Sequence, residues 1–345
     1  MTIVETRPRV VGGVDTHLDV HVAAALDSLG GLLGTESFPT TPAGEVALFT
    51  WLSSFGRPEV VGVEGTGAYG AGLLRFLAAA GVEVREVIRP NRQARRRDGK
   101  SDVLDAVEAA RAVLAGRTGV PKRRDGQVEA IRALLVARRS AAQARQKALV
   151  QMRHLTYTAP EHLRNALKGL TVAALVERAA SLRPRVGEDV VSAATRSALV
   201  ALARRARALE RELAATDALL GPLVAETAPG LVALVGVGTV TGAMLLVAAG
   251  DNPERLHSEA AFAHLCGVAP LEASSGRSGR HRLDRGGDRQ ANSALWRIVI
   301  VRTTCDPRTR AYLERRVKEG QSKREAIRSL KRYVAREVYK QLPRD

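Results

Sequence analysis

Short apolar runs alternate with stretches of helical periodicity through residues 8–120, and this order constrains the fold most. The runs VVGGV, HVAAAL and 32–38, the last after a Gly-Gly turn at residues 30–31, predict three successive antiparallel strands. A helix over 43–53, a strand over 60–63, a helix over 71–80, the strand VEVREVI and a last helix should follow. The order β-β-β-α-β-α-β-α predicts an α/β domain.

Four acids stand at the ends of these expected elements, which is where a nuclease of the ribonuclease H-like superfamily, with the same element order, places metal ligands. Asp15 and Glu64 follow strands, while Asp102 and Asp105, three residues apart, share one face of a helix. Carboxylate oxygens suit Mg²⁺, and two ions ~3.5–4 Å apart neutralise the charge that develops in phosphodiester cleavage. Each acid taken singly is equally typical of a turn or helix cap, with Ser101 or Asp102 as the cap, but the four together favour a metal site.

The charge balance favours a polyanionic partner. The chain has 345 residues, more than one compact core usually takes, with 53 Lys and Arg against 36 Asp and Glu, a net charge of +17. Such an excess favours nucleic acid through phosphate neutralisation. Aromatic residues make up only 3% of the chain, so arginine–phosphate contacts should outweigh base stacking.

The central part of the chain changes to long helices, and we predict three domains: 8–120, 125–225 and 228–345. A heptad seam in the second domain favours either a helical hairpin within one protomer or a coiled coil between protomers. Its residues are Leu199, Leu202, Ala206, Leu209, Leu213, Thr216, Leu220 and Leu223. The third domain should be mostly helical.

The uncharged segment 231–250 is long enough to cross a bilayer, but its recurring glycines and the lack of a flanking aromatic or basic belt favour a buried helix-hairpin-helix-like segment. Its Gly-Val-Gly turn could present N–H groups to a phosphate. Cys266 and Cys305 lack metal-ligand spacing, and the N-terminus lacks a secretory pattern, so we expect a reducing cytoplasm and no membrane.

The segment ASSGRSGRHR supplies Ser274, Ser275 and Ser278 among glycines and arginines. No His/Asp partner is placed by spacing, and a flexible basic loop with incidental serines explains this composition equally, so the segment alone shows no nucleophile. Two basic segments are candidate nucleic-acid contacts. Their residues are Arg92, Arg95, Arg96, Arg97, Lys100, Arg277, Arg280, Arg282, Arg285 and Arg289.

Three segments together resemble the IS-one-ten family of insertion-sequence transposases, which are bridge-RNA-guided serine/DEDD recombinases: VEGTGAYG, GKSDVLDA and CGVAPLEASSGRSGRHRLDRGGDRQANSALWR. The resemblance implies a RuvC-like N-terminal domain whose acids bind Mg²⁺, with Mn²⁺ as a substitute, and a C-terminal serine that forms a covalent phosphoserine with DNA. Ser275, before Gly276, matches that serine, with Ser274 in reserve. The chain departs from the family pattern at Val268 and Asp288, where the family has Leu and Asn.

The resemblance also implies donor and target DNA, a structured guide RNA, a homo-oligomer (dimer or tetramer) and a place at the bacterial nucleoid. The first hypothesis is therefore an RNA-guided recombinase in which the four acids hold Mg²⁺ near Ser275. A Holliday-junction-type nuclease that uses metal-activated water is the alternative. A non-catalytic nucleic-acid-binding protein with structural acids is the third.

Overall fold

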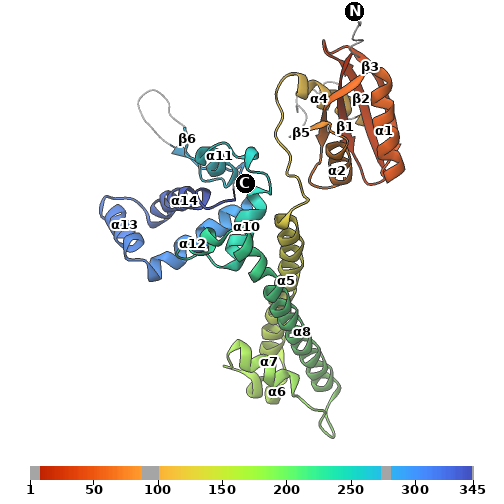
Figure 1. Cartoon of the computed structure of the whole chain (residues 1–345). Helices are drawn as coiled ribbons and strands as arrows, with labels where there is room; N and C mark the ends of the chain where they lie inside the picture. Colours follow the sequence, from red (N-terminus) through yellow and green to blue (C-terminus); the bar gives the residue numbers. More distant parts are fainter. Residues whose placement is uncertain (1–7, 88–100, 273–280, 344–345) are drawn as a thin grey trace, which may run out of the picture. The chain divides into compact units, whose positions relative to one another are not determined.

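The computed structural model describes residues 8–87, 101–272 and 281–343 and divides the chain into two compact units (Figure 1). The first unit comprises 1–129, 249–262 and 343–345, and the second comprises 130–248 and 263–342. The segment 249–262, taken from within the predicted C-terminal domain, thus belongs to the N-terminal unit. The three-domain division remains a prediction.

The first unit is built on a five-stranded sheet with the order β3-β2-β1-β4-β5. Its strands are β1 (Arg9–Thr16), β2 (Val20–Asp27), β3 (Leu32–Pro39), β4 (Arg57–Glu64) and β5 (Glu83–Val87). β2 pairs antiparallel with β1 and with β3, whereas β4 pairs parallel with β1 and with β5. The predicted element order is confirmed, and the mixed sheet is compatible with a ribonuclease H-like start.

Helices cover both faces of this sheet because successive strand side chains point to opposite sides. α1 (Pro42–Phe55) and α2 (Ala71–Ala79) contribute leucines such as Leu48 and Leu73 to the core cluster on one face. α4 (Asp102–Leu114) packs on the other face, where Ala106 meets Ala24. The N-terminal part of the chain is therefore an α/β domain, as predicted.

The second unit begins with four helices, of which the first and the last are long. They are α5 (Gln127–Thr158), α6 (Glu161–Leu167), α7 (Val172–Ala180) and α8 (Val190–Thr227). The first residues of the predicted seam, Leu199 and Ala206, are buried in a cluster with Met152 of α5 and Leu175 of α7. This part of the seam therefore packs within one chain, as the hairpin alternative expects. A coiled coil between protomers remains a proposal.

The rest of the second unit is also mostly helical. After α9 (Pro229–Val232) and α10 (Thr239–Ala249), the elements are η1 (Pro253–Arg255, in the first unit), α11 (Glu259–Leu265), a short hairpin of β6 (Leu271–Glu272) and β7 (His281–Arg282), α12 (Arg289–Cys305), α13 (Pro307–Lys318) and α14 (Lys323–Tyr339). Gly236, with φ of +80°, lies in the Gly-Val-Gly turn between α9 and α10. Among the described residues no helix is long and apolar enough to cross a membrane.

Candidate metal centre

The pairing of β1 with β4 brings the ends of these two strands together. Because the pair is parallel, with Val14 opposite Val63, Asp15 and Glu64 leave neighbouring strands at the same edge of the sheet. The Thr16 hydroxyl reinforces this junction by donating to the Glu64 carbonyl oxygen at 2.7 Å. The first two predicted ligands thus come from adjacent strand ends.

α4 brings the other two acids to this edge, and Gly13 makes its close approach possible. A Cβ atom at Gly13 would lie 2.2 Å from the Ala106 carbonyl oxygen of α4. Ser101 is the N-cap residue of α4 but its side chain makes no capping hydrogen bond. Asp102 is the first residue of the helix rather than its cap, so the capping alternative does not account for this carboxylate.

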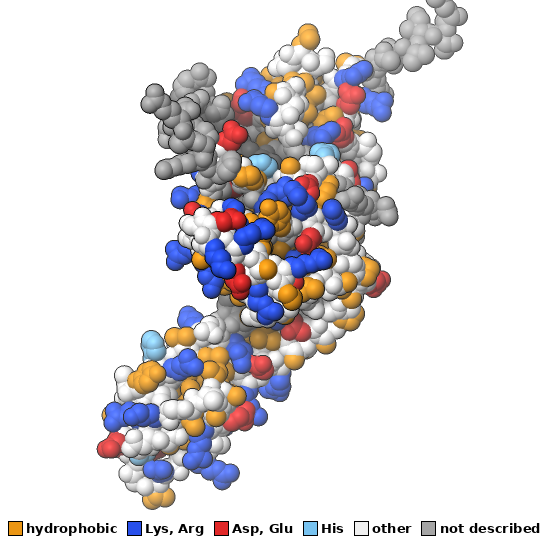
Figure 2. All heavy atoms as spheres, turned by 90° about the vertical axis from the view of Figure 1, so that its left-hand side faces the viewer, with side chains coloured by type: hydrophobic (Ala, Val, Ile, Leu, Met, Phe, Trp, Pro, Cys, Tyr) orange, Lys and Arg blue, Asp and Glu red, His pale blue; other side chains and the backbone are white. Residues whose placement is uncertain are grey.

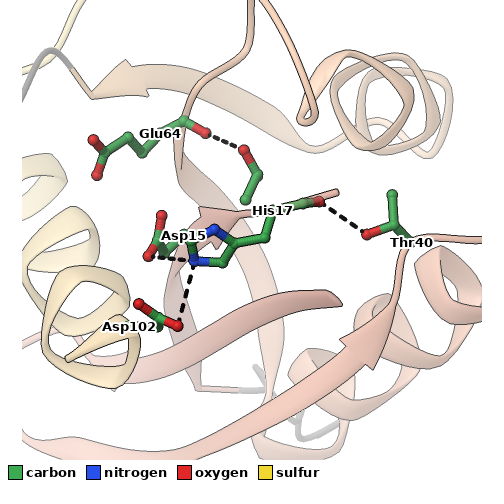
Figure 3. A network of polar contacts seen from close by, with 6 residues as sticks. Asp15, His17, Thr40, Glu64 and Asp102 are labelled. Carbon is green, nitrogen blue, oxygen red and sulfur yellow. Dashed lines mark hydrogen bonds and ion pairs between the residues drawn. The ribbon is translucent and has the colours of Figure 1, made fainter. Parts of the chain in front are cut away.

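His17, which the sequence analysis did not single out, links two of the predicted acids (Figure 3). Its Nε2 lies 3.1 Å from Asp15 Oδ2 and 3.5 Å from Asp102 Oδ2. The Thr40 hydroxyl, at 3.2 Å, donates to the His17 carbonyl oxygen and fixes the turn after β1. Among the described residues, Asp15, His17 and Asp102 form a group whose potential ligand atoms all lie within 4.8 Å of one another.

Fewer specific contacts fix the positions of the other two acids, Asp105 and Glu64. Asp105 is buried, with 4% of its surface exposed, and it lies near enough to Asp15 for their charges to interact. Glu64 is joined to the group through its carbonyl oxygen, and Figure 3 shows its side chain extending to the same side of the sheet edge as the carboxylates of Asp15 and Asp102.

Burial and charge crowding both act on Asp15. Burial raises the pKa of its carboxyl above the ordinary aspartate value, while the neighbouring His17 lowers this pKa and the charges of Asp105 and Asp102 raise it further. This carboxyl is costly to ionise on its own because it is buried and because two acids lie near it. The arrangement therefore favours binding of a positive group between these carboxylates.

The predicted residues of the serine segment and of the two basic segments are only partly described. The residues outside the described part of the chain are Ser274, Ser275, Arg92, Arg95, Arg96, Arg97, Lys100, Arg277 and Arg280. Arg282, Arg285 and Arg289 are exposed in the second unit. Close to the β6–β7 hairpin, His264 Nδ1 lies 3.3 Å from Asp284 Oδ2. The sequence did not predict this pair, because the two residues are 20 positions apart and no spacing pattern connects them.

Other residues of the same C-terminal motif hold its backbone together. The Asn292 amide donates to the carbonyl oxygens of Cys266 and Gly267, at 2.8 and 3.1 Å. A Cβ at Gly287 would lie 2.1 Å from the Gly267 nitrogen, so two backbone segments are in contact there. Asp288, the departure from the family pattern, is the N-cap of α12 and accepts from the Gln290 and Ala291 N–H groups. Its carboxylate thus has a structural use in this chain.

Two family models match the chain in succession. A DEDD transposase model of the IS110 group, described as a transposase, matches residues 12–158. A second, described as a transposase of the IS116/IS110/IS902 family, matches residues 230–314. The first match spans the strand-end acids and α4, and the second spans the serine segment.

Curated relatives come from insertion elements. An uncharacterized 43.6 kDa protein of insertion element IS110 from Streptomyces coelicolor is 35% identical over 148 residues, covering 42% of this chain and 34% of the relative. An uncharacterized 42 kDa protein of insertion element IS900 from Mycobacterium paratuberculosis is 30% identical over 172 residues, covering 49% of this chain and 43% of the relative. The aligned part is thus less than half of either relative. The chain belongs to the IS110 (IS-one-ten) family of insertion-sequence transposases.

Proposed function

We propose that this chain is a DNA transposase, an enzyme that cuts and rejoins DNA during movement of an insertion sequence. The observation that carries this function is the convergence of Asp15 and Asp102 on one nitrogen, with Asp105 and the end of β4 beside them. Family membership supplies the reaction class, and the excess of 53 basic over 36 acidic residues suits a DNA substrate.

The four acids Asp15, Glu64, Asp102 and Asp105 would hold divalent metal, Mg²⁺ in pairs, with Mn²⁺ as a substitute. Their fit rests on the oxygens of Asp15 and Asp102, which already lie around one nitrogen atom, His17 Nε2. When bound, the ions neutralise negative charge on the attacking and leaving oxygens of a phosphodiester. A RuvC-like architecture for residues 8–120 accords with this ligand set.

We assign the nucleophile to Ser275, with Ser274 in reserve, because this serine matches the family motif. Its oxygen would attack the scissile phosphorus, forming a phosphoserine as the bond to the leaving DNA oxygen breaks. The hydroxyl proton passes to a base and the departing strand ends in a hydroxyl. Rejoining reverses this step with the hydroxyl of a new DNA end.

The basic residues named in the sequence analysis would contact donor and target DNA and a structured guide RNA. The long helices α5 and α8 offer a surface for association of protomers into a dimer or tetramer. Such a protein would work at the bacterial nucleoid. Family membership implies these partners, and the net charge of +17 supports the nucleic acids among them.

One experiment separates serine chemistry from the alternative, a Holliday-junction-type nuclease using metal-activated water. The protein is incubated with Mg²⁺, cognate DNA and the RNA that flanks the element, and denaturing gels are examined for a protein–DNA band. A recombinase gives this adduct in wild type and loses it in Ser275→Ala, whereas Ser278→Ala, the matched control, retains it. Cleavage without an adduct, leaving free 5′-phosphates, would instead establish the nuclease.

A further inference from the structure

A groove of about 860 Å³ runs through the second unit between α5, α10 and the start of α12. Its lining includes one acid, Asp288, and five cations: Arg132, Arg138, Arg139, Lys147 and Arg297. Asp288, the acid, accepts hydrogen bonds from N–H groups at the start of α12. The groove therefore carries an excess of positive charge.

The cations differ in how far they are engaged by protein groups. Arg138 is held by both oxygens of Asp217, at 2.5 and 3.0 Å. The Arg139 guanidinium lies 3.1 Å from the side-chain amide of Gln290 on α12, which directs it across the groove. Arg139, Lys147 and Arg297 are exposed, so their charges are available to a ligand in water.

Apolar side chains line the groove together with these cations and with polar residues such as Gln143 and Ser293. Val136 and Val150 of α5 are 58% and 42% exposed, and Met244 and Val247 of α10 line the groove with them. On α5 the apolar and cationic residues Val136, Arg139, Lys147 and Val150 fall on one helical stripe because their spacings are three, eight and three. A ligand here meets cationic and apolar side chains side by side.

A second cavity, of about 580 Å³, continues this surface because it shares Val240 and Arg297 with the groove. Trp296 of α12 lines it opposite the Gly-Val-Gly turn and is 47% exposed. The other tryptophan, Trp51, packs edge-on against Phe55 in the first unit. The exposed indole therefore lies beside the cationic groove, where it offers an aromatic face to a ligand.

We propose that this surface, from Trp296 to Lys147, binds a single strand of DNA. Phosphates would lie against Arg139, Lys147 and Arg297, and an unpaired base would stack on Trp296. A duplex keeps its bases stacked inside and would leave the indole and the apolar side chains without contacts. The strand is assigned to DNA because the proposed function cuts and rejoins DNA, and binding of RNA instead is an outcome of the test below. Figure 2 shows basic side chains interspersed with hydrophobic ones on the face it presents.

This proposal rests on the proposed function, since strand cutting yields single-stranded ends, but its test needs no catalysis. Fluorescence anisotropy of the full chain is measured in EDTA with labelled 20-nucleotide single strands of DNA and RNA and with duplex DNA, at several salt concentrations. Arg139→Gln combined with Lys147→Gln should lower the salt slope for single-stranded DNA by about 1.4, at ~0.7 for each lost phosphate contact. Trp296→Ala should weaken binding of the same strand by about tenfold.

Matched variants keep the test sharp. Arg204→Gln on α8 and Tyr157→Ala on α5, exposed residues that line neither cavity, should leave both quantities unchanged. Trp296→Phe should restore most of the affinity, and equal melting temperatures show that each variant folds. The proposal is overturned if the groove variants bind single-stranded DNA like these controls. It is also overturned if they affect only duplex or RNA binding, or if they alter self-association measured by sedimentation but no DNA affinity.

If the covalent adduct fails to form while the groove variants still lose single-strand affinity, the proposed function falls and the groove assignment stands. If the adduct forms normally while the groove variants bind single-stranded DNA like the wild type, the groove assignment falls and the proposed function stands. The two proposals can therefore fail separately.

Discussion

At the scale of single residues, Asp102 offers the cleanest test of metal binding. Its side chain is 48% exposed and does not cap α4, so Asp102→Asn removes a charge without opening the core. We predict that Mg²⁺ raises the melting temperature of the wild type, with stabilisation of ~2.7 kcal/mol at 100 times its Kd, and that Asp102→Asn loses most of this effect. Differential scanning fluorimetry over a Mg²⁺ titration measures both.

Asp19→Asn is the matched control, because Asp19 is an exposed acid four residues after Asp15 and outside the group that could hold metal. This variant should keep the wild-type response to Mg²⁺. Equal responses in Asp102→Asn and Asp19→Asn would show that the acids at the sheet edge do not bind the ion.

His21 provides a residue-scale prediction about pH. It is 1% exposed on β2, and neither ring nitrogen has a hydrogen-bond partner among the described residues. Burial, with a smaller effect from His17, lowers its pKa below the ordinary histidine value. The unfolded chain therefore binds the proton more readily, and stability should be full above about pH 6.5 and fall as the pH drops below it.

Urea unfolding at pH 7.5 and pH 5.5 checks this prediction. The loss of stability at the lower pH should be smaller in His21→Leu, which cannot be protonated. His154→Gln, at an exposed histidine in the other unit, should behave like the wild type. A His21→Leu profile as steep as that of the wild type would assign the pH effect to other groups.

The positions of Asp15 near a strand end and of Asp102 at a helix start were predictable, because such positions are visible in the pattern of apolar residues. Their role as metal ligands stays a prediction. The contact of His17 with two of these acids was not predictable, since a histidine directly after a strand has no distinctive spacing. Its position between two carboxylates depends on the turn that the Thr40 hydroxyl fixes.

At the scale of elements, the contact between β1 and α4 decides whether the acids converge. Gly13→Ala would place a methyl group 2.2 Å from the Ala106 carbonyl oxygen and 2.3 Å from the Ala110 nitrogen, so α4 must move away from the sheet. We predict a loss of stability of about 1–3 kcal/mol and a weaker response to Mg²⁺, because Asp102 and Asp105 move with the helix. Chemical unfolding and the Mg²⁺ titration measure the two effects.

Gly81→Ala is a suitable comparison for this element. A Cβ at Gly81 would meet nothing within 4 Å, although its φ of +77° strains any L residue. This variant should therefore lose some stability while keeping the Mg²⁺ response. A Gly13→Ala protein with a normal Mg²⁺ response would show that the acids do not depend on the seating of α4.

The element order of the first unit was predictable because β-branched runs and glycine turns punctuate the sequence at short intervals. The partner of the heptad seam was not, since the same spacing suits a neighbour in the same chain or in another. The structure places Leu199 and Ala206 against α5 and α7, where Met152 and Leu175 fill the space between the helices. The packing partner of the seam depends on how the side-chain volumes fit together, and the spacing of apolar residues carries no information about this fit.

At the scale of the whole molecule, the chain returns to its first unit after the long helices. Asn252 donates from its amide to the Pro121 carbonyl oxygen at 3.0 Å, and Asp251 accepts from the Val128 N–H group at 2.9 Å. These pairs are separated by 131 and 123 residues. No local pattern in the sequence marks such contacts, so the predicted division at residues 225–228 gave no sign of this return.

We therefore predict that the first unit is weakened by substitutions far from it in sequence. Asn252 is 2% exposed, and Asn252→Ala leaves the buried Pro121 carbonyl oxygen without its amide donor, at a cost of about 1–3 kcal/mol. Hydrogen exchange should show faster opening of β1 and β4 in this variant, while α12 and α14 in the second unit keep their protection. Asn292→Ala, which removes the amide bonded to Cys266 and Gly267 in the second unit, should show the opposite distribution. If Asn252→Ala instead loosened both units equally, the two would unfold as one cooperative body, and a local defect at the sheet edge that carries the four acids could not be separated from global unfolding.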